Sequence, residues 1–432
     1  MKNQKIKIKI QRYKLANGVR VILIPDNRAT MTCAEVAVEI GSGHETKRTN
    51  GTAHFLEHML CAGTKKRKSN KKINIQLRQM GGKGMHALTS CWTTSCFVYV
   101  PSPHSLSAVD VLLDCFMNAT IKKSAVEREK EPILQEIAEY EDSSVEKAAL
   151  VVGKLVSGDT PLGRNICGTR NIVRNMTAKK LHHFRDSFYV PNATVVTIAG
   201  RFKKKAIKRL LEKTIGKLPQ CLGKIPIIQK PSKNGLGQQC LLVARRTKQT
   251  RLAMGINTIG LVDNRFNVLE LIVFILDNRI EDKIRGKMDL VYSASVRVNS
   301  VLSTGMITIE AGIAPDNLKK AVKAILVELS KLANKKIGHQ ELKMVKAQYK
   351  GAIYADLETS GGKVGVVNEK ELHLKERKSL DSILEECDNV TAKDIIKLSQ
   401  EIFRSGEKLK LAVVGSHKNI SKAEQLMAKF SI

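Results

Sequence analysis

Residues 50–63 read NGTAHFLEHMLCAG, and this stretch contains two histidines four residues apart, His54 and His58. On a helix of 3.6 residues per turn, side chains at this spacing lie on one face, close enough to share one metal ion. Glu57, three residues after His54, lies on the same side. Two neutral imidazoles and a carboxylate suit Zn²⁺ in a catalytic site, where a further position is left for water. The stretch therefore predicts a helix over 52–61 that carries part of a zinc site.

A metal site of this kind can hydrolyse peptide bonds. Bound Zn²⁺ lowers the pKa of its water toward about 7, and a nearby carboxylate can take the proton during attack on a peptide carbonyl. The pattern alone also fits two histidines on the exposed face of a helix, because the chain has 10 histidines and the H-x-x-E-H pattern is short.

A further ligand must come from elsewhere in the chain. The segment 129–142, EKEPILQEIAEYED, supplies several candidate glutamates. Its spacing predicts a helix over about 124–142, with Pro132 at a position where an interior proline costs about 3 kcal/mol unless a kink or a fresh helix start absorbs it. The residues by themselves do not select one glutamate.

The order of apolar and polar segments predicts an α+β protein. Strands are expected at 18–25, 32–40 and 93–101, and helices at 71–80 and 104–120. The segments ATVVTIAG, ending at Gly200, and LKLAVVG, ending at Gly415, repeat one pattern about half a chain apart. We therefore predict two similar domains, residues 1–220 and 237–432, joined by a Pro- and Gly-containing linker at 221–236.

The composition is that of a folded protein with an unusual charge. The chain has 432 residues, of which 43% are hydrophobic and 26% charged, and its formal net charge is +32. A lysine-rich surface explains this charge most simply, and an acidic partner, a nucleic acid or an anionic membrane face are the alternatives. Only 4% of the residues are aromatic and the lysines are spread over both halves, which argues against nucleic-acid binding as the main function.

The nine cysteines and the N-terminus indicate where the protein works. The cysteines are odd in number and widely spaced, with no C-x-x-C pair, so we expect free thiols and no cysteine-type zinc site. Residues 1–15 are basic and have no apolar core of a signal peptide, and no apolar run is long enough to span a membrane. These features favour a cytoplasmic protein, or an organelle matrix if the source is eukaryotic.

The HFLEH motif and its surroundings resemble the pitrilysin, insulinase and mitochondrial processing peptidase family of inverzincin zinc metallopeptidases. The resemblance extends through LANGVRVILIPDN (15–27), EIGSGHE (39–45), TPLGRNICGTRNIV (160–173) and FYVPNATVVTIAG (188–200). It covers the first half closely and residues 240–432 loosely. It implies a zinc metalloendopeptidase made of two homologous α/β-layered domains of the processing-peptidase (LuxS/metallopeptidase-like) type.

The resemblance also implies roles for individual residues. Two glutamates seven residues apart follow the motif in the family, and here they match Glu129 and Glu136. Glu136 is then the third zinc ligand beside His54 and His58, and Glu129 orients a ligand or the bound water. Glu57 is implied as the general base and then the proton donor.

Other implied positions concern the substrate. In the second half, Arg285 and Tyr292 resemble a pair that helps to hold the substrate backbone near zinc, and both side chains can donate hydrogen bonds to a carbonyl. His86 and Ala87 stand where the family has an edge strand that pairs with an extended peptide.

The second half has no H-x-x-E-H, so one Zn²⁺ per chain is expected. The resemblance implies a closed chamber formed by a homodimer, or by a heterodimer with a homologous, inactive subunit. The alternative within this fold is a catalytically inactive scaffold subunit. The alternative from a different class is a basic nucleic-acid-binding protein, which rests on the net charge alone.

Overall fold

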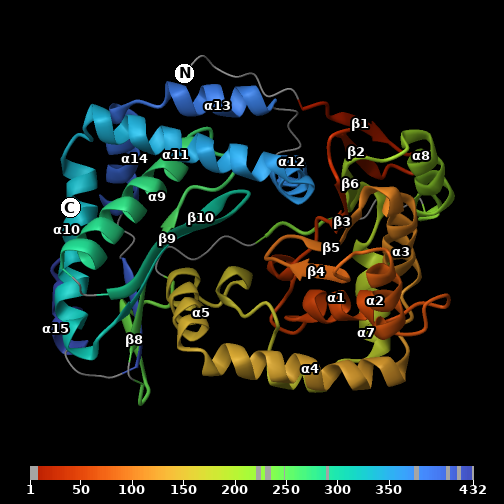
Figure 1. The fold of residues 1–432 in the computed structure, drawn as a ribbon. Coiled ribbons are helices and arrows are strands. Elements are labelled where there is room, and N and C mark those ends of the chain that lie inside the picture. Colours follow the sequence, from red (N-terminus) through yellow and green to blue (C-terminus); the bar gives the residue numbers. More distant parts are fainter. Residues whose placement is uncertain are drawn as a thin grey trace. The chain divides into compact units, whose positions relative to one another are not determined.

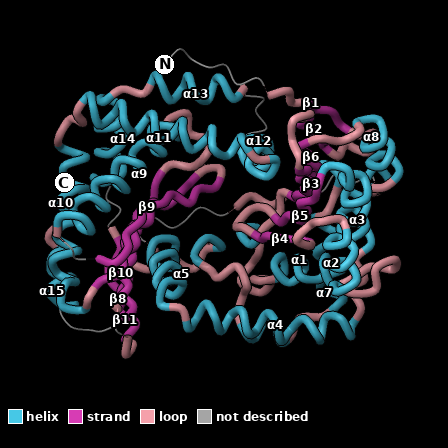
Figure 2. Tube along the Cα trace, in the orientation of Figure 1, coloured by secondary structure: helices cyan, strands magenta, loops and turns pink. Residues whose placement is uncertain are grey.

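The computed structural model describes residues 8–219, 225–228, 235–247, 249–288, 291–373, 379–404, 409–415 and 420–430. The chain forms two compact units (Figure 1). Unit 1 comprises Met1–Ile137, Asn165–Gln229 and Ile353–Arg377, and unit 2 comprises Ala138–Arg164, Lys230–Ala352 and Lys378–Ile432. Each unit contains one sheet and its own covering helices, as the tube in Figure 2 shows by colour.

Unit 1 is built on a six-stranded mixed sheet in the order β1-β2-β6-β3-β5-β4. The strand β6 pairs in parallel with β2, and the remaining neighbours pair antiparallel. All seven residues of β6 are buried, as expected for a strand between two covered faces. The strands are β1 (Gln11–Lys14), β2 (Arg20–Pro25), β3 (Met31–Val38), β4 (Met85–Thr89), β5 (Thr94–Pro101) and β6 (Thr194–Gly200).

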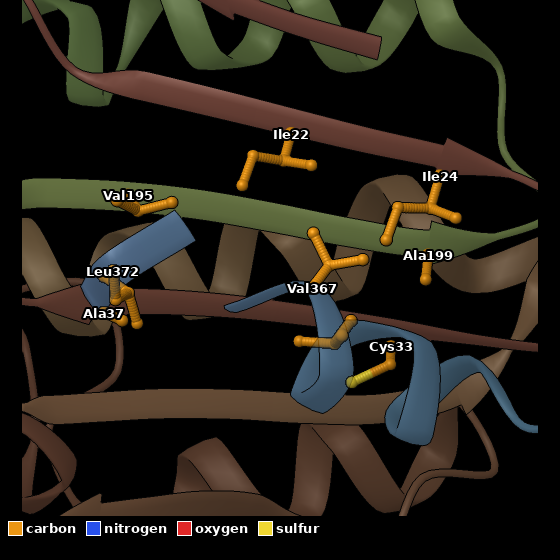
Figure 3. Close-up of a cluster of buried hydrophobic side chains, with 9 residues drawn as sticks. Ile22, Ile24, Cys33, Ala37, Val195, Ala199, Val367 and Leu372 are labelled. Carbon is orange, nitrogen blue, oxygen red and sulfur yellow. The ribbon is translucent and has the colours of Figure 1, made fainter. Parts of the chain in front are cut away.

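Helices cover this sheet. The helix α3 packs on β3 and β5, α1 packs on β4, and α12 packs on β3 and β6. In Figure 3, Val367 and Leu372 of α12 meet the strand residues Ile22, Ala37 and Val195 in one buried cluster. Burying such side chains contributes about 1.5–3 kcal/mol each. The helices of unit 1 are α1 (Thr52–Ala62), α2 (Asn70–Gln79), α3 (Ser105–Asn118), α6 (Arg170–Arg174), α7 (Ala178–Phe188), α8 (Lys204–Lys213) and α12 (Ser360–His373).

Unit 2 contains a five-stranded sheet in the order β7-β11-β8-β10-β9. Its strands are β7 (Cys240–Ala244), β8 (Thr250–Thr258), β9 (Val291–Val301), β10 (Thr304–Ile313) and β11 (Lys410–Gly415). The helix α5 packs on β8 and β11. The helices are α5 (Ser144–Ser157), α9 (Phe266–Ile280), a π-helix at Glu281–Lys287, α10 (Leu318–Asn334), α13 (Leu380–Asn389), α14 (Ala392–Arg404) and α15 (Ile420–Ala428).

Two long helices cross from one unit to the other along the chain, α4 (Lys123–Asp142) and α11 (His339–Glu358). The helix α4 runs without a break through Pro132. Glu136 therefore stands on the same helix as the residues before the proline, and no fresh helix start is needed.

The two sheets have the same topology. Without β1, the strand order in unit 1 is β2-β6-β3-β5-β4. The first and last of these strands along the chain, β2 and β6, form the parallel pair, and all other neighbours are antiparallel. Unit 2 has the same order, with β7 and β11 as the parallel pair. The predicted α+β class with two layered domains is thus confirmed. The boundary at 221–236 stays a prediction, and residues 221–224 and 229–234 lie outside the described residues.

The compact units differ from simple halves of the sequence in one respect. The helix α5 lies in the first half of the chain and covers the sheet of unit 2, whereas α12 lies in the second half and covers the sheet of unit 1. Each half of the sequence therefore contributes one helix to the unit that is formed mainly by the other half. Within the described ranges, no helix combines the length and the apolar character needed to cross a membrane.

Candidate metal centre

The helix α1 presents both histidines of the motif on one face. The predicted helix at 52–61 is confirmed, with bounds of Thr52–Ala62. The ring centroids of His54 and His58 lie 4.8 Å apart. The His54 side chain is almost fully buried, and His58 is partly exposed. This one-turn spacing on a helix places the two imidazoles beside each other.

The start of α1 is fixed by a buried carboxylate. Glu45 accepts hydrogen bonds from the backbone N–H groups of Gly51 at 2.7 Å and Ala53 at 2.6 Å, and from the side chain of Asn50 at 3.2 Å. The backbone N–H groups of Gly51 and Ala53 lie at the N-terminus of α1, where N–H groups have no hydrogen-bond partners inside the helix. A negative charge here also suits the helix dipole. Burial raises the pKa of Glu45 to about 7, against the lowering effect of these hydrogen bonds.

The helix α4 brings two carboxylates to this face of α1. Oε2 of Glu136 lies 3.4 Å from Nε2 of His54 and 3.5 Å from Nε2 of His58. Oε2 of Glu129 lies 3.6 Å from Nδ1 of His58. Because seven residues make about two helical turns, Glu129 and Glu136 stand on the same side of α4. His58 is therefore held between two carboxylates, one on each ring nitrogen.

The donor atoms of this cluster lie close enough together to share one cation. One donor atom from each of His54, His58 and Glu136 lies within 4.8 Å of the other two. With metal–ligand bonds of about 2.0–2.1 Å and tetrahedral angles, the donor atoms of a zinc site lie about 3.4 Å apart. The two observed separations between imidazole nitrogen and carboxylate oxygen, 3.4 and 3.5 Å, match this value. Imidazole and carboxylate are also donor types that Zn²⁺ accepts.

The charges in this cluster favour a bound proton at the position where a metal cation would bind. Hydrogen bonds from His54 and His58 hold the pKa of Glu136 well below its ordinary value. Burial lowers the pKa of His58, but hydrogen bonds to Glu129 and Glu136 outweigh it and raise this pKa to about 9. A divalent cation would take the place of that proton, because imidazole binds metals in its neutral form.

Glu57 lies at the edge of the same cluster. Its Oε2 accepts a 2.6 Å hydrogen bond from the hydroxyl of Thr89, the last residue of β4. Sequence reasoning did not identify Thr89. The bond fixes the orientation of the carboxylate, and it ties α1 to the strand that contains His86 and Ala87.

The strand β4 is the last strand in the order of its sheet. His86 is exposed, and its ring stacks on Phe97 of the neighbouring strand with centroids 5.2 Å apart. Ala87 pairs with Cys96. An outer strand offers backbone N–H and C=O groups to an added strand. Residues 86–87 therefore lie on a strand to which an extended peptide could pair, as predicted.

The two predicted substrate residues of the second half belong to unit 2. Arg285 lies on the π-helix, is exposed, and forms an ion pair with Glu281 at 2.8 Å. Tyr292 is the second residue of β9, and its side chain lies outside the described residues. Their role at a metal stays a prediction.

Sequence reasoning also missed Cys167. Its Sγ is 3.9 Å from Nε2 of His54 and 3.8 Å from Oε1 of Glu136. Burial is the largest of the causes that raise the pKa of this thiol above its ordinary value, and the charge of Glu136 adds to it. All eight cysteines that the structure describes are free, as the sequence predicts. The sequence holds no signal for Cys167, because more than a hundred residues separate it from His54 and no motif links them.

Comparison with known proteins gives a consistent result. A family model described as "Insulinase (Peptidase family M16)" matches residues 20–170, and one described as "Peptidase M16 inactive domain" matches residues 175–349. The chain is 30% identical over 402 residues to an uncharacterized zinc protease of Bacillus subtilis, covering 91% of this chain and 96% of that one.

Two further proteins extend the comparison. The beta subunit of the mitochondrial-processing peptidase of Neurospora crassa is 26% identical over 411 residues, covering 91% of this chain and 85% of that one. The crystal structure of a protease from Helicobacter pylori matches with a TM-score of 0.86 at 19% identity, covering 94% of this chain and 99% of that one. The structural match shows the same fold.

Proposed function

Because the chain belongs to peptidase family M16, the insulinase family, we propose that it is a zinc-dependent metalloendopeptidase that cleaves peptides or short segments of unfolded proteins. The observation that carries this proposal is the meeting of two imidazoles and the Glu136 carboxylate, whose donor atoms all lie within 4.8 Å of one another. Glu57 lies on α1, the helix that also contains the two imidazoles.

The proposed zinc ligands are His54, His58 and Glu136. When bound, zinc supplies a Lewis acid that polarises a peptide carbonyl and lowers the pKa of water. Glu57 then acts as general base and returns the proton to the leaving amine. The hydrogen bond from Thr89 supports this role, because it holds the carboxylate in one orientation beside α1.

Glu129 has a positioning role in this proposal. Its carboxylate faces Nδ1 of His58, so it fixes the ring and the tautomer that leaves Nε2 free for a metal. The same contact raises the basicity of the imidazole. Loss of Glu129 is therefore expected to weaken metal binding without removing a ligand.

The substrate is proposed to be an extended peptide that adds to β4 beside His86 and Ala87. Backbone hydrogen bonds along an outer strand recognise any sequence, and the side-chain preference would come from neighbouring pockets. Arg285 and Tyr292 are proposed to hold the substrate backbone from the facing subunit of a homodimer or of a heterodimer with a homologous chain. The free thiols support a reducing compartment such as the cytoplasm as the place of action.

Removal and return of the metal tests the function. The purified chain should hydrolyse an unfolded polypeptide substrate, lose this activity on chelation, and recover it on addition of about one equivalent of Zn²⁺. A chain that binds zinc but cleaves no peptide in a broad library would instead be the inactive scaffold subunit. The intact donor set with Glu57 beside it favours the peptidase, since a scaffold needs neither.

A further inference from the structure

The helix α8 presents a row of basic side chains to solvent. The stretch 201–217, which contains α8, has eight basic residues and a single acidic one, Glu212, whereas the whole chain has 73 basic and 41 acidic residues. Lys205, Arg209 and Lys213 are exposed and follow one another at intervals of four residues. Residues four apart are neighbours on the surface of a helix, about 6 Å apart along its axis. These three charges therefore form a ridge along α8.

Two more basic residues widen this ridge. Arg201 and Lys208 are also exposed, and Nζ of Lys208 lies 4.6 Å from the centroid of the Tyr13 ring in β1. In the part of the chain that the structure describes, neither these two residues nor the three of the ridge have an ion-pair partner. The positive charge of the surface is therefore not neutralised within the protein. The five residues are called the α8 basic face: Arg201, Lys205, Lys208, Arg209 and Lys213.

The opposite side of α8 is used within unit 1. Ile207 and Leu211 are fully buried, and α8 packs against α3. Because the apolar side of the helix is already covered, a partner of the α8 basic face must bind through charge. Figure 1 shows α8 beside β1 and β2, and β1 and β4 are the two outer strands of this sheet. The face is therefore separate from the proposed metal site, whose helix α1 packs on β4.

The composition of this face distinguishes between anionic partners. The centre of a protein interface is rich in aromatic residues and methionine and poor in lysine, and 201–217 has no exposed large hydrophobic residue. Single-stranded nucleic acids stack their bases on aromatic rings set among basic residues, but the Tyr13 ring lies under Lys208. Lysine is a hydrated charge on a flexible stem, which suits a surface whose anions are themselves mobile. Clusters of about four to eight basic residues on an amphipathic helix bind bilayers with anionic headgroups.

We propose that the α8 basic face docks the protein on the surface of an anionic lipid bilayer. The docking is peripheral and electrostatic, because Ile207 and Leu211 stay packed in unit 1. Each basic residue close to such a bilayer strengthens binding about fivefold. Salt weakens this binding, since the Debye length falls from about 10 Å at 0.1 M to about 3 Å at 1 M. The inference does not depend on zinc or on peptide hydrolysis.

Co-sedimentation of the full chain with vesicles tests the proposal. The wild type should bind vesicles of phosphatidylcholine and phosphatidylglycerol at about 0.1 M salt and leave them at about 1 M salt. It should not bind vesicles of phosphatidylcholine alone. A triple variant with Lys205→Gln, Arg209→Gln and Lys213→Gln should bind at least about tenfold more weakly. Glutamine is a good helix former, and if the triple variant nevertheless unfolds, Arg209→Gln alone should lose about fivefold.

The matched control removes the same charge from another helix. Lys319, Lys320 and Lys323 are exposed on α10 of unit 2, and their replacement by glutamine also lowers the net charge by three. We expect vesicle binding of this second triple variant to change by less than about threefold. Equal losses in the two triple variants would show that the net charge of +32 drives binding without a particular face, and would overturn the proposal.

Competition tests the class of partner. Duplex RNA and polyglutamate are added to the vesicle mixture at equal concentrations of negative charge, and the wild type should remain on the vesicles. Transfer of the wild type to RNA or to polyglutamate, with loss of that binding in the α8 triple variant, would replace the lipid by another polyanion. Failure of the wild type to bind anionic vesicles at low salt would contradict the proposal outright.

Discussion

Nδ1 of His58 lies 3.6 Å from Oε2 of Glu129, while Nε2 of the same ring lies 3.5 Å from Glu136. The two carboxylates come from one helix, α4, two turns apart. Nε2 therefore faces the proposed metal. Glu129 contacts Nδ1 on the other side of the ring, so it orients the ring and is not itself a metal ligand. This division separates binding from positioning and makes the two separately testable.

Replacing Glu129 should weaken metal binding without abolishing it. In Glu129→Gln the amide keeps the size of the side chain but loses the charge that holds Nδ1–H of His58. We expect zinc affinity, measured by competition with a chromophoric chelator, to fall about 10–100-fold. The control is Glu131→Gln, an exposed glutamate on the same helix. Equal affinities in the wild type and Glu129→Gln would contradict the positioning role.

Replacing Glu57 should separate chemistry from metal binding. Glu57→Gln keeps the donor set, but the amide cannot accept a proton. Turnover of a fluorogenic peptide should fall about 10²–10⁴-fold, with zinc content unchanged in the same sample. Wild-type turnover in this variant would mean that another residue is the base.

Mixing two inactive variants tests the proposed facing subunit. Glu57→Gln chains lack the base, and Arg285→Ala chains lack the proposed substrate contact, so neither should cleave peptides alone. If Arg285 acts on the zinc site of its partner, exchanged dimers contain one complete site, and activity should return to roughly a quarter to a half of wild type. Proven subunit exchange without any rescue would return Arg285 to a structural role, as its ion pair with Glu281 would then suggest.

The buried Glu45 predicts a pH dependence of stability. Its pKa is raised from 4.5 to about 7, chiefly by burial. A raised pKa means that the folded state holds the proton more tightly than the unfolded state, so this contribution is present below about pH 4.5 and is lost as the pH rises through 7. The free energy of unfolding of the wild type should therefore fall by roughly 3 kcal/mol more than that of Glu45→Gln between these pH values. Chemical denaturation of both proteins without metal measures the difference, and parallel pH profiles would contradict it.

Local patterns in the sequence predict much of the fold and part of the site. The spacing of His54 and His58 is a property of one helix, and the strands that end at Gly200 and Gly415 follow from their apolar runs and closing glycines. The layered two-domain fold was predicted through the repeat of this pattern and through family resemblance.

Contacts between distant segments could not be predicted in this way. The helix α5 packs on the sheet of unit 2 and α12 on the sheet of unit 1, each away from its own half of the sequence. The apolar face of an amphipathic helix shows that the helix packs on something, but it does not specify which sheet. Glu45, Thr89 and Cys167 are single residues without a repeated or spaced pattern. Their relation to the site comes from three separate loops and strands that fold against α1.

The zinc content of two purified variants tests the central claim most directly. Elemental analysis of the wild type should give about one zinc per chain. His58→Ala removes an imidazole from the cluster in which three donors lie within 4.8 Å, and it should retain almost none under the same conditions. Glu131→Ala, on the exposed side of α4, should retain the wild-type amount. Near-full zinc retention in a folded His58→Ala protein would contradict the assignment of this site.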